Sequence, residues 1–168
     1  LTATVTATVA PPTPVGNVVI TEIMYHAPQE HADYLELFNR STTDTVDLSG
    51  CRLDGVDFVF PMGVFLGPRQ SRILADNVTA YAQIYTNAEV VLGAYDGELD
   101  NGGERLALLA PGADSNTWIT IDEVCYDDDP PWPAAADGQG QSLQLLDPEQ
   151  DNNRPGNWDA VNLYAGQT

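Results

Sequence analysis

Two glutamates in neighbouring predicted strands have the residue type and spacing that catalysis could use. Glu22 lies in the run VVITEIMY and Glu36 in the run DYLELFN, and two adjacent carboxylates can serve as general acid and general base. We expect a structural role instead, because a carboxylate in a sheet can accept hydrogen bonds from loop backbone or from arginine. The sequence therefore predicts no catalytic residue at these positions.

The loop between these strands contains the two histidines of the chain. His26 and His31, with Glu30 beside His31, could bind zinc through imidazole and carboxylate atoms. The spacing does not match the i, i+4 arrangement of a helical zinc motif, since Pro28 lies between the histidines. Exposed loop residues explain the pattern better.

Three consecutive aspartates, Asp127, Asp128 and Asp129, are the weak calcium candidates of this chain. Carboxylate oxygens are the ligands that Ca²⁺ prefers, but the spacing is not that of an EF-hand loop. A solvated acidic loop is the default interpretation, so we expect no cofactor other than this candidate calcium ion. The chain also has no lysine, no phosphate-binding glycine motif and no G-x-S-x-G elbow, which argues against an enzyme.

Two cysteines and two sequons are candidate modification sites. In a secreted protein Cys51 and Cys125 could form a disulfide; the alternative is two buried free thiols. Asn39 and Asn77 each begin an N-glycosylation sequon, which matters only if the source glycosylates asparagine. Chance occurrence is the alternative for both sequons.

The charge balance limits the partners of the protein. The 168 residues include 25 acidic and 6 basic residues, a net charge of -19. Such a surface repels phosphate backbones and anionic lipids, so we expect no nucleic-acid partner. No apolar run is long enough for a transmembrane helix, so we expect no membrane insertion. We interpret the acidic surface mainly as a solubility device in a salty medium.

The first ten residues read LTATVTATVA, and the first nine of them alternate strictly between apolar and polar. This period-2 pattern predicts a strand, and Pro11, Pro12 and Pro14 predict a stiff linker after it. The strand could be the remnant of an upstream domain, an edge strand of its own sandwich, or a strand donated to a neighbouring subunit. Its apolar face, the expected subunit contact, consists of Leu1, Ala3, Val5, Ala7 and Val9.

The remaining sequence is similar to the lamin tail domain family from Val18 to Trp158. The matching motifs are the I-x-E-I and Y-x-E-L-x-N strands, VDLSGCRL at 46–53, and the run from Trp132 through DGQGQSLQL to NNRPGNW. This resemblance implies an all-β, immunoglobulin-like β-sandwich without catalytic function. It also implies a module that is common in secreted and surface proteins of bacteria and archaea.

Several local patterns add detail to this fold. Asn77 is expected to cap one short helix over VTAYAQIY. Residues 89–94 and 105–110, separated by an Asp-Asn-Gly-Gly turn, are predicted to form a hairpin. Trp132 and Trp158 are expected to seal the ends of the sandwich, although Trp132 could instead be a sugar-stacking platform in a proline-rich loop.

We therefore expect an N-terminal strand over residues 1–10, a proline-rich linker over 11–16 and a lamin-tail-like sandwich over 17–168. The chain is expected to be a processed protein or a segment of a longer one. The preferred function is a structural module of an extracellular or cell-surface assembly, a filament subunit joined by its first strand. The alternative is a carbohydrate- or calcium-binding module of a larger secreted enzyme. Expected partners are a second copy or a neighbouring domain.

Overall fold

The computed structural model describes residues 13–85, 90–114 and 116–161. The predicted N-terminal strand, including the expected subunit contacts Leu1, Ala3, Val5, Ala7 and Val9, lies outside the described residues. In the described part of the chain, no helix is both long and apolar enough to cross a bilayer.

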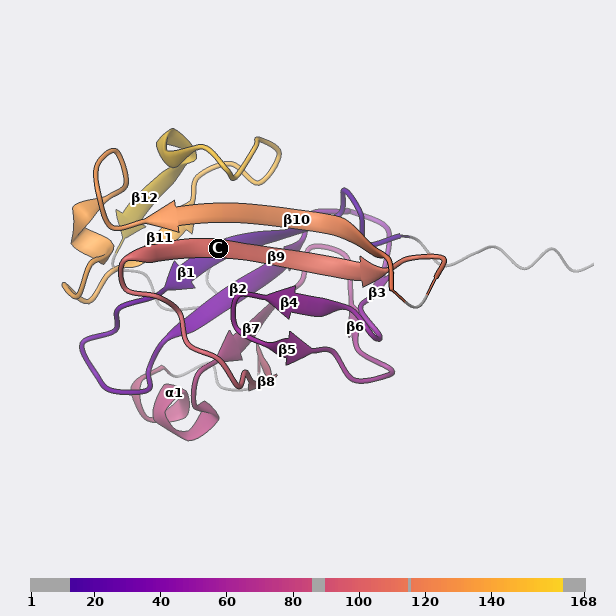
Figure 1. Cartoon of the computed structure of the whole chain (residues 1–168), viewed down its shortest axis with the longest axis horizontal. Helices are drawn as coiled ribbons and strands as arrows, with labels where there is room; N and C mark the ends of the chain where they lie inside the picture. The colour runs from indigo at the N-terminus through magenta and orange to yellow at the C-terminus, as the bar shows by residue number, and fades with distance from the viewer. Residues whose placement is uncertain (1–12, 86–89, 115, 162–168) are drawn as a thin grey trace, which may run out of the picture.

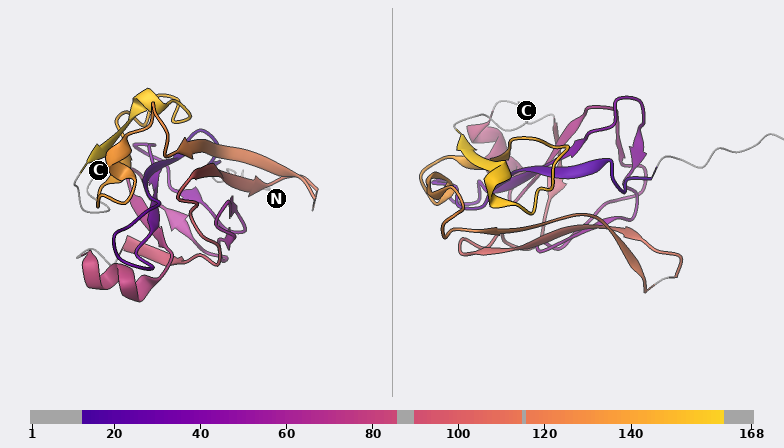
Figure 2. Two further views of the ribbon diagram at one scale, coloured as in Figure 1. Left: turned by 60° about the vertical axis from the view of Figure 1, so that its left-hand side comes forward. Right: turned by 90° about the horizontal axis from the view of Figure 1, so that it is seen from above.

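The strands form two facing sheets and a small two-stranded sheet (Figure 1). The six-stranded sheet has the order β12 (Trp158–Val161), β11 (Ser142–Leu145), β1 (Val18–Met24), β2 (Tyr34–Asn39), β7 (Ser71–Ala75) and β8 (Val91–Ala94). The four-stranded sheet has the order β10 (Trp118–Asp127), β9 (Gly103–Pro111), β4 (Arg52–Asp54) and β5 (Phe58–Val59). The small sheet pairs β3 (Val46–Asp47) with β6 (Phe65–Leu66). The strand pairs are antiparallel except for β7 with β8, which is parallel. Figure 2 shows the two sheets as separate layers, which confirms the predicted β-sandwich.

Apolar side chains from both sheets meet between the layers. Every residue of β1 and β2 is buried, and Ile20 and Leu37 lie opposite one another in the ladder and point inward. From the facing sheet, Leu53 and Leu108 are also opposite one another and enter the same core. The alternation of apolar residues along each strand therefore places one face of each sheet in a common core.

The two tryptophans of the C-terminal motif lie inside this core. The rings of Trp132 and Trp158 are 6.1 Å apart, and Trp158 Nε1 donates a hydrogen bond of 2.6 Å to the Asn152 carbonyl. Trp132 is only 7% exposed. The sugar-stacking interpretation of Trp132 is therefore wrong, because its ring is packed against Trp158 rather than presented to solvent.

One short α-helix, α1 (Val78–Ile84), packs on the outer face of the six-stranded sheet. Asn77 caps it by accepting hydrogen bonds from the backbone of Thr79 and Ala80, as predicted. Tyr81 packs edge-on against Tyr34 of β2, with ring centroids 5.4 Å apart. The helix thus buries a second, smaller aromatic cluster. Two 3₁₀ turns complete the described elements, η2 (Ala134–Ala136) and η3 (Pro155–Asn157).

The predicted hairpin of residues 89–94 and 105–110 is wrong. β8 pairs in parallel with β7, whereas β9 pairs with β4 and β10 in the other sheet. The connection crosses between the layers, and the Gly97 amide donates a hydrogen bond to the Val56 carbonyl on the way. The Asp-Asn-Gly-Gly turn is real, since the Asp100 side chain accepts from the Gly102 amide, but it ends a crossing loop instead of a hairpin.

Candidate functional site

The two strand glutamates face each other on the outer side of the six-stranded sheet. Glu22 and Glu36 are direct partners in the β1–β2 ladder, and Glu22 is 0% exposed. Glu22 Oε1 accepts hydrogen bonds from the Tyr34 hydroxyl at 2.5 Å and the Ser142 hydroxyl at 2.6 Å. It also accepts one from the Gln144 amide at 3.2 Å. The expectation of a structural role fits this geometry, but the partners are side chains of neighbouring strands rather than loop backbone or arginine.

Burial raises the pKa of Glu22, because it penalises the charged form of the carboxyl group, and repulsion from Glu36 adds a smaller effect. Glu36 Oε1 accepts a 2.8 Å hydrogen bond from the Thr21 hydroxyl. A substrate has no access to a carboxylate with no exposed surface, so the arrangement can order three strands but does not present an acid–base pair.

The sequence of β11 contains a local signal for two of these partners. Ser142 and Gln144 alternate with the core residues Leu143 and Leu145 in β11. Period-2 alternation places the two polar side chains on the face opposite the core, which is the face that carries Glu22. The alternation is visible in the sequence, but it does not show that β11 pairs with β1.

The structure pairs the two histidines with different carboxylates. His26 Nδ1 lies 2.7 Å from Asp137 Oδ1, and His31 Nδ1 lies 2.8 Å from Asp76 Oδ2. The hydrogen bond to Asp76 raises the pKa of His31. Over residues 13–85, 90–114 and 116–161, neither histidine belongs to a group of three metal-binding side chains, so the geometry does not support a zinc site.

The calcium candidates Asp127, Asp128 and Asp129 do come together. One ligand oxygen from each lies within 4.8 Å of the others. Asp127 Oδ1 also accepts a 2.8 Å hydrogen bond from the Asp129 amide. This bond within the loop helps to hold its conformation. Exposed acidic loops commonly have this form without an ion, and calcium binding here stays a prediction.

The two cysteines are free thiols, Cys51 buried and Cys125 exposed. Both cysteines lie beside β9, but at different heights along it. Arg52, the residue after Cys51, is opposite Leu109, whereas Cys125 is opposite Arg105. Four residues along a strand correspond to about 13 Å, and a disulfide requires Cα atoms within about 7 Å. The candidate disulfide is therefore not formed in this fold, and the alternative of two buried thiols holds only for Cys51.

The two sequons have different surroundings. Asn39 is 0% exposed, and its Nδ2, the atom that would carry a glycan, donates to the carbonyls of Asp44, Leu66 and Gly67. A glycan at Asn39 is incompatible with these bonds. Asn77 is exposed at the start of α1, and its glycosylation stays a prediction.

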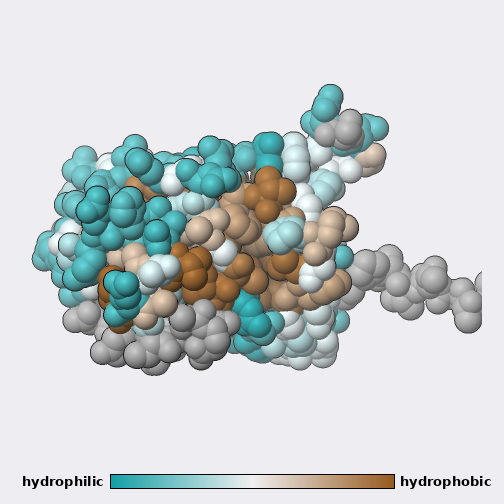
Figure 3. All heavy atoms as spheres, turned by 90° about the horizontal axis from the view of Figure 1, so that it is seen from below, coloured by the Kyte–Doolittle hydropathy of each residue, from teal (hydrophilic) through white to brown (hydrophobic). Residues whose placement is uncertain are grey.

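An open apolar side of the sandwich is the surface that best fits a contact with another chain. Among the described residues, β5 pairs only with β4, and β8 pairs only with β7, so each is an edge strand. Phe58 reaches across from β5, and its ring would lie 3.4 Å from a Cβ atom at Gly93 of β8. Val59 is 64% exposed, and Figure 3 shows apolar side chains gathered on the face that carries these edges.

Comparison with known proteins identifies the domain type. A model of the Lamin Tail Domain family matches residues 11–128, more than half of the chain. No curated protein and no solved structure matches the chain. The matched segment runs from the proline linker to the end of β10 and stops before Trp132.

Proposed function

Because the chain belongs to the lamin tail domain family, whose members are non-enzymatic Ig-like modules, we propose that it is a structural module of an extracellular or cell-surface assembly. In this proposal the N-terminal segment of one copy adds as a strand to a second copy. Repetition of that contact joins subunits head to tail into a filament.

The observation that carries this proposal is the open apolar side between β5 and β8. Two unpaired strand edges there leave backbone amides and carbonyls without a neighbouring strand among the described residues, and such edges accept an added strand. The first nine residues of the chain alternate between apolar side chains and threonine. An alternating strand of this kind can bury its apolar face on Phe58 and leave threonines toward solvent.

The composition supports the proposed location. A net charge of -19 keeps a module soluble where salt screens its self-repulsion, and the contact segment itself carries no charge within LTATVTATVA. Charge repulsion between copies would therefore act on the body of the module rather than on the segment proposed to join them.

Paired substitutions on the two faces of the segment test the contact. Val5→Asp with Val9→Asp charges the apolar face, while Thr4→Asp with Thr6→Asp adds the same charge to the polar face. We expect the first pair, like deletion of residues 1–14, to abolish self-association in sedimentation velocity, and the second pair to retain it.

A substitution on the acceptor surface completes the design. Val59→Asp is expected to weaken self-association as strongly as the Val5/Val9 pair, because it places a charge beside the β5 edge. The proposal is wrong if the deletion leaves the oligomeric state unchanged, or if the two faces of the segment respond equally.

The alternative function is a ligand-binding module of a larger secreted enzyme. The convergence of Asp127, Asp128 and Asp129 within 4.8 Å favours calcium over carbohydrate as that ligand, and the burial of Trp132 removes the aromatic platform that a sugar would need. A monomer whose stability rises with calcium would favour this alternative.

A further inference from the structure

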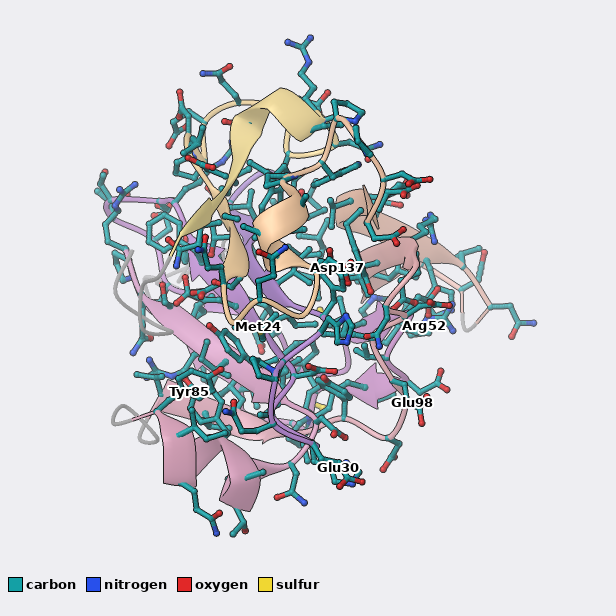
Figure 4. The ribbon with its side chains drawn as sticks, turned by 90° about the vertical axis from the view of Figure 1, so that its left-hand side faces the viewer. Met24, Glu30, Arg52, Tyr85, Glu98 and Asp137 are labelled. Carbon is teal, nitrogen blue, oxygen red and sulfur yellow. The ribbon has the colours of Figure 1, made fainter. Side chains whose placement is uncertain are left out.

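One end of the sandwich contains an acidic pocket that is separate from the Asp127–Asp129 loop. It has a volume of about 700 Å³ and lies between the β1–β2 loop, the end of β7 and the β8–β9 loop. Figure 4 looks onto this end, where Glu30, Glu98 and Asp137 come from three different loops. The carboxylates that line the pocket are those of Asp33, Asp76, Asp96, Glu98, Asp100 and Glu104.

The pocket concentrates negative charge with little internal compensation. His31 is the only basic side chain among the residues that line it. Burial raises the pKa of Asp33, and repulsion from Asp76 adds to this effect. Burial and the charge of Asp100 likewise raise the pKa of Glu104. A cation in the pocket would relieve these unfavourable interactions.

A buried hydroxyl in the wall of the pocket gives independent evidence for a ligand. Tyr95 is only 4% exposed, and its Oη is buried without a hydrogen-bond partner among the described residues. Tyr95 is one of the residues that line the pocket, and the charges of Asp33, Asp76 and Glu104 raise the pKa of its hydroxyl, after the larger effect of burial. Buried polar groups rarely remain without a partner, and a rearrangement of the pocket that admits a water molecule held by a bound ion would supply one.

We propose that this pocket binds a hydrated divalent cation of the calcium type. Ca²⁺ takes six to eight oxygen ligands and retains water in flexible sites, so carboxylates from three loops can share it while a bound water reaches Tyr95. The three ligand atoms that already lie within 4.8 Å of one another in the described structure are those of Asp127–Asp129. The pocket carboxylates must therefore move together on binding, and we expect a Kd of about 1 mM, typical of extracellular modules.

Thermal unfolding of chelator-treated protein tests the site. We expect 10 mM CaCl₂ to raise the Tm by about 4 °C beyond NaCl of equal ionic strength. The NaCl control is essential because salt alone stabilises a chain with a net charge of -19. The exposed pair Asp96→Asn with Glu98→Gln should remove most of the calcium-specific gain. The comparison variant Asp127→Asn, Asp128→Asn and Asp129→Asn should retain it.

Substitution of the buried hydroxyl gives a second readout. Tyr95→Phe removes the unpartnered group, so we expect the calcium-free Tm to rise and the calcium-induced gain to fall. The proposal is overturned if NaCl reproduces the whole gain, if calcium gives none, or if Tyr95→Phe leaves the gain unchanged. It is also overturned if the substitutions at 127–129 remove the gain while those at Asp96 and Glu98 do not, since the ion would then occupy the aspartate loop.

Discussion

Substitution of Glu22 can separate its role as a hydrogen-bond acceptor from its charge. Glu22→Ala removes the acceptor of the Tyr34 and Ser142 hydroxyls and of the Gln144 amide. A buried donor left without a partner costs about 1–3 kcal/mol. With three donors affected and partial relaxation of the hydroxyls, we expect Glu22→Ala to lower the free energy of unfolding by about 3–5 kcal/mol. Glu22→Gln keeps an acceptor oxygen, so we expect a change within about 1 kcal/mol at neutral pH.

The two substitutions also differ in their dependence on pH. Burial raises the pKa of Glu22 above its ordinary value of 4.5 in the folded protein. The folded state therefore retains this proton at pH values where the unfolded chain has released it. The stability that the protonated group provides is fully present below pH 4.5 and is lost as the pH rises through the folded-state pKa. Glutamine has no such proton, so Glu22→Gln should become more stable relative to the parent as the pH rises.

Urea unfolding followed by tryptophan fluorescence at pH 4.5, 6.0 and 7.5 measures both effects. Glu98→Gln makes the same chemical change at an exposed position and serves as the control. Other carboxyl groups with raised pKa values contribute equally to parent and variant, so they cancel in the difference. An equal effect of Glu22→Gln at pH 4.5 and 7.5 would contradict the raised pKa. A Glu22→Ala variant as stable as Glu22→Gln would contradict the acceptor role.

One further substitution and one thiol reagent test local features of the fold. Asn77→Ala removes the side-chain cap of α1 and should lower the free energy of unfolding by about 1 kcal/mol, measured by the same urea titration with Asn77→Asp as the retained-cap control. A maleimide at pH 7 should label one thiol in the native protein and two after denaturation, because Cys125 is exposed whereas Cys51 is buried and its pKa is raised to about 11. Native labelling of neither thiol, or of both, would contradict this placement.

The strands at the centre of the fold could be predicted because their signals are local. Val18–Met24 and Tyr34–Asn39 are short runs rich in β-branched, aromatic and apolar residues with turn formers between them. Their pairing needs only a short loop, which favours adjacent antiparallel strands. The cap at Asn77 was predictable for the same reason, since a side chain that accepts from the next two or three amides depends on few neighbours.

The features that could not be predicted depend on contacts between distant segments. The apolar pattern of Val91–Ala94 does not distinguish a partner in the same hairpin from a parallel partner such as β7. Ser142 meets Glu22 across 120 residues of sequence, which only the order of strands in the sheet determines. Asn39 has a complete sequon, but its side-chain amide donates to three carbonyls from later parts of the chain. Burial of a side chain is a tertiary property that a short motif does not contain.

The acidic pocket and the start of β1, from which the proposed donor segment extends, lie at opposite ends of the six-stranded sheet of one copy. Val18 at the start of β1 lies opposite Asn39, and Met24 at its end lies opposite Tyr34. The chain therefore enters at one end of this sheet, and the β1–β2 loop of the pocket lies at the other (Figure 1). The span between them is about 20 Å at 3.3 Å per residue, beyond the Debye length of about 10 Å at 0.1 M salt. The Val5/Val9 variant should thus keep its full calcium-induced gain in Tm. The Asp96/Glu98 variant is not used for this comparison, because the proposed acceptor edge β8 ends directly before Tyr95 of the pocket. Loss of the calcium-induced gain in the Val5/Val9 variant would show that the donor segment and the pocket are coupled, contrary to this separation.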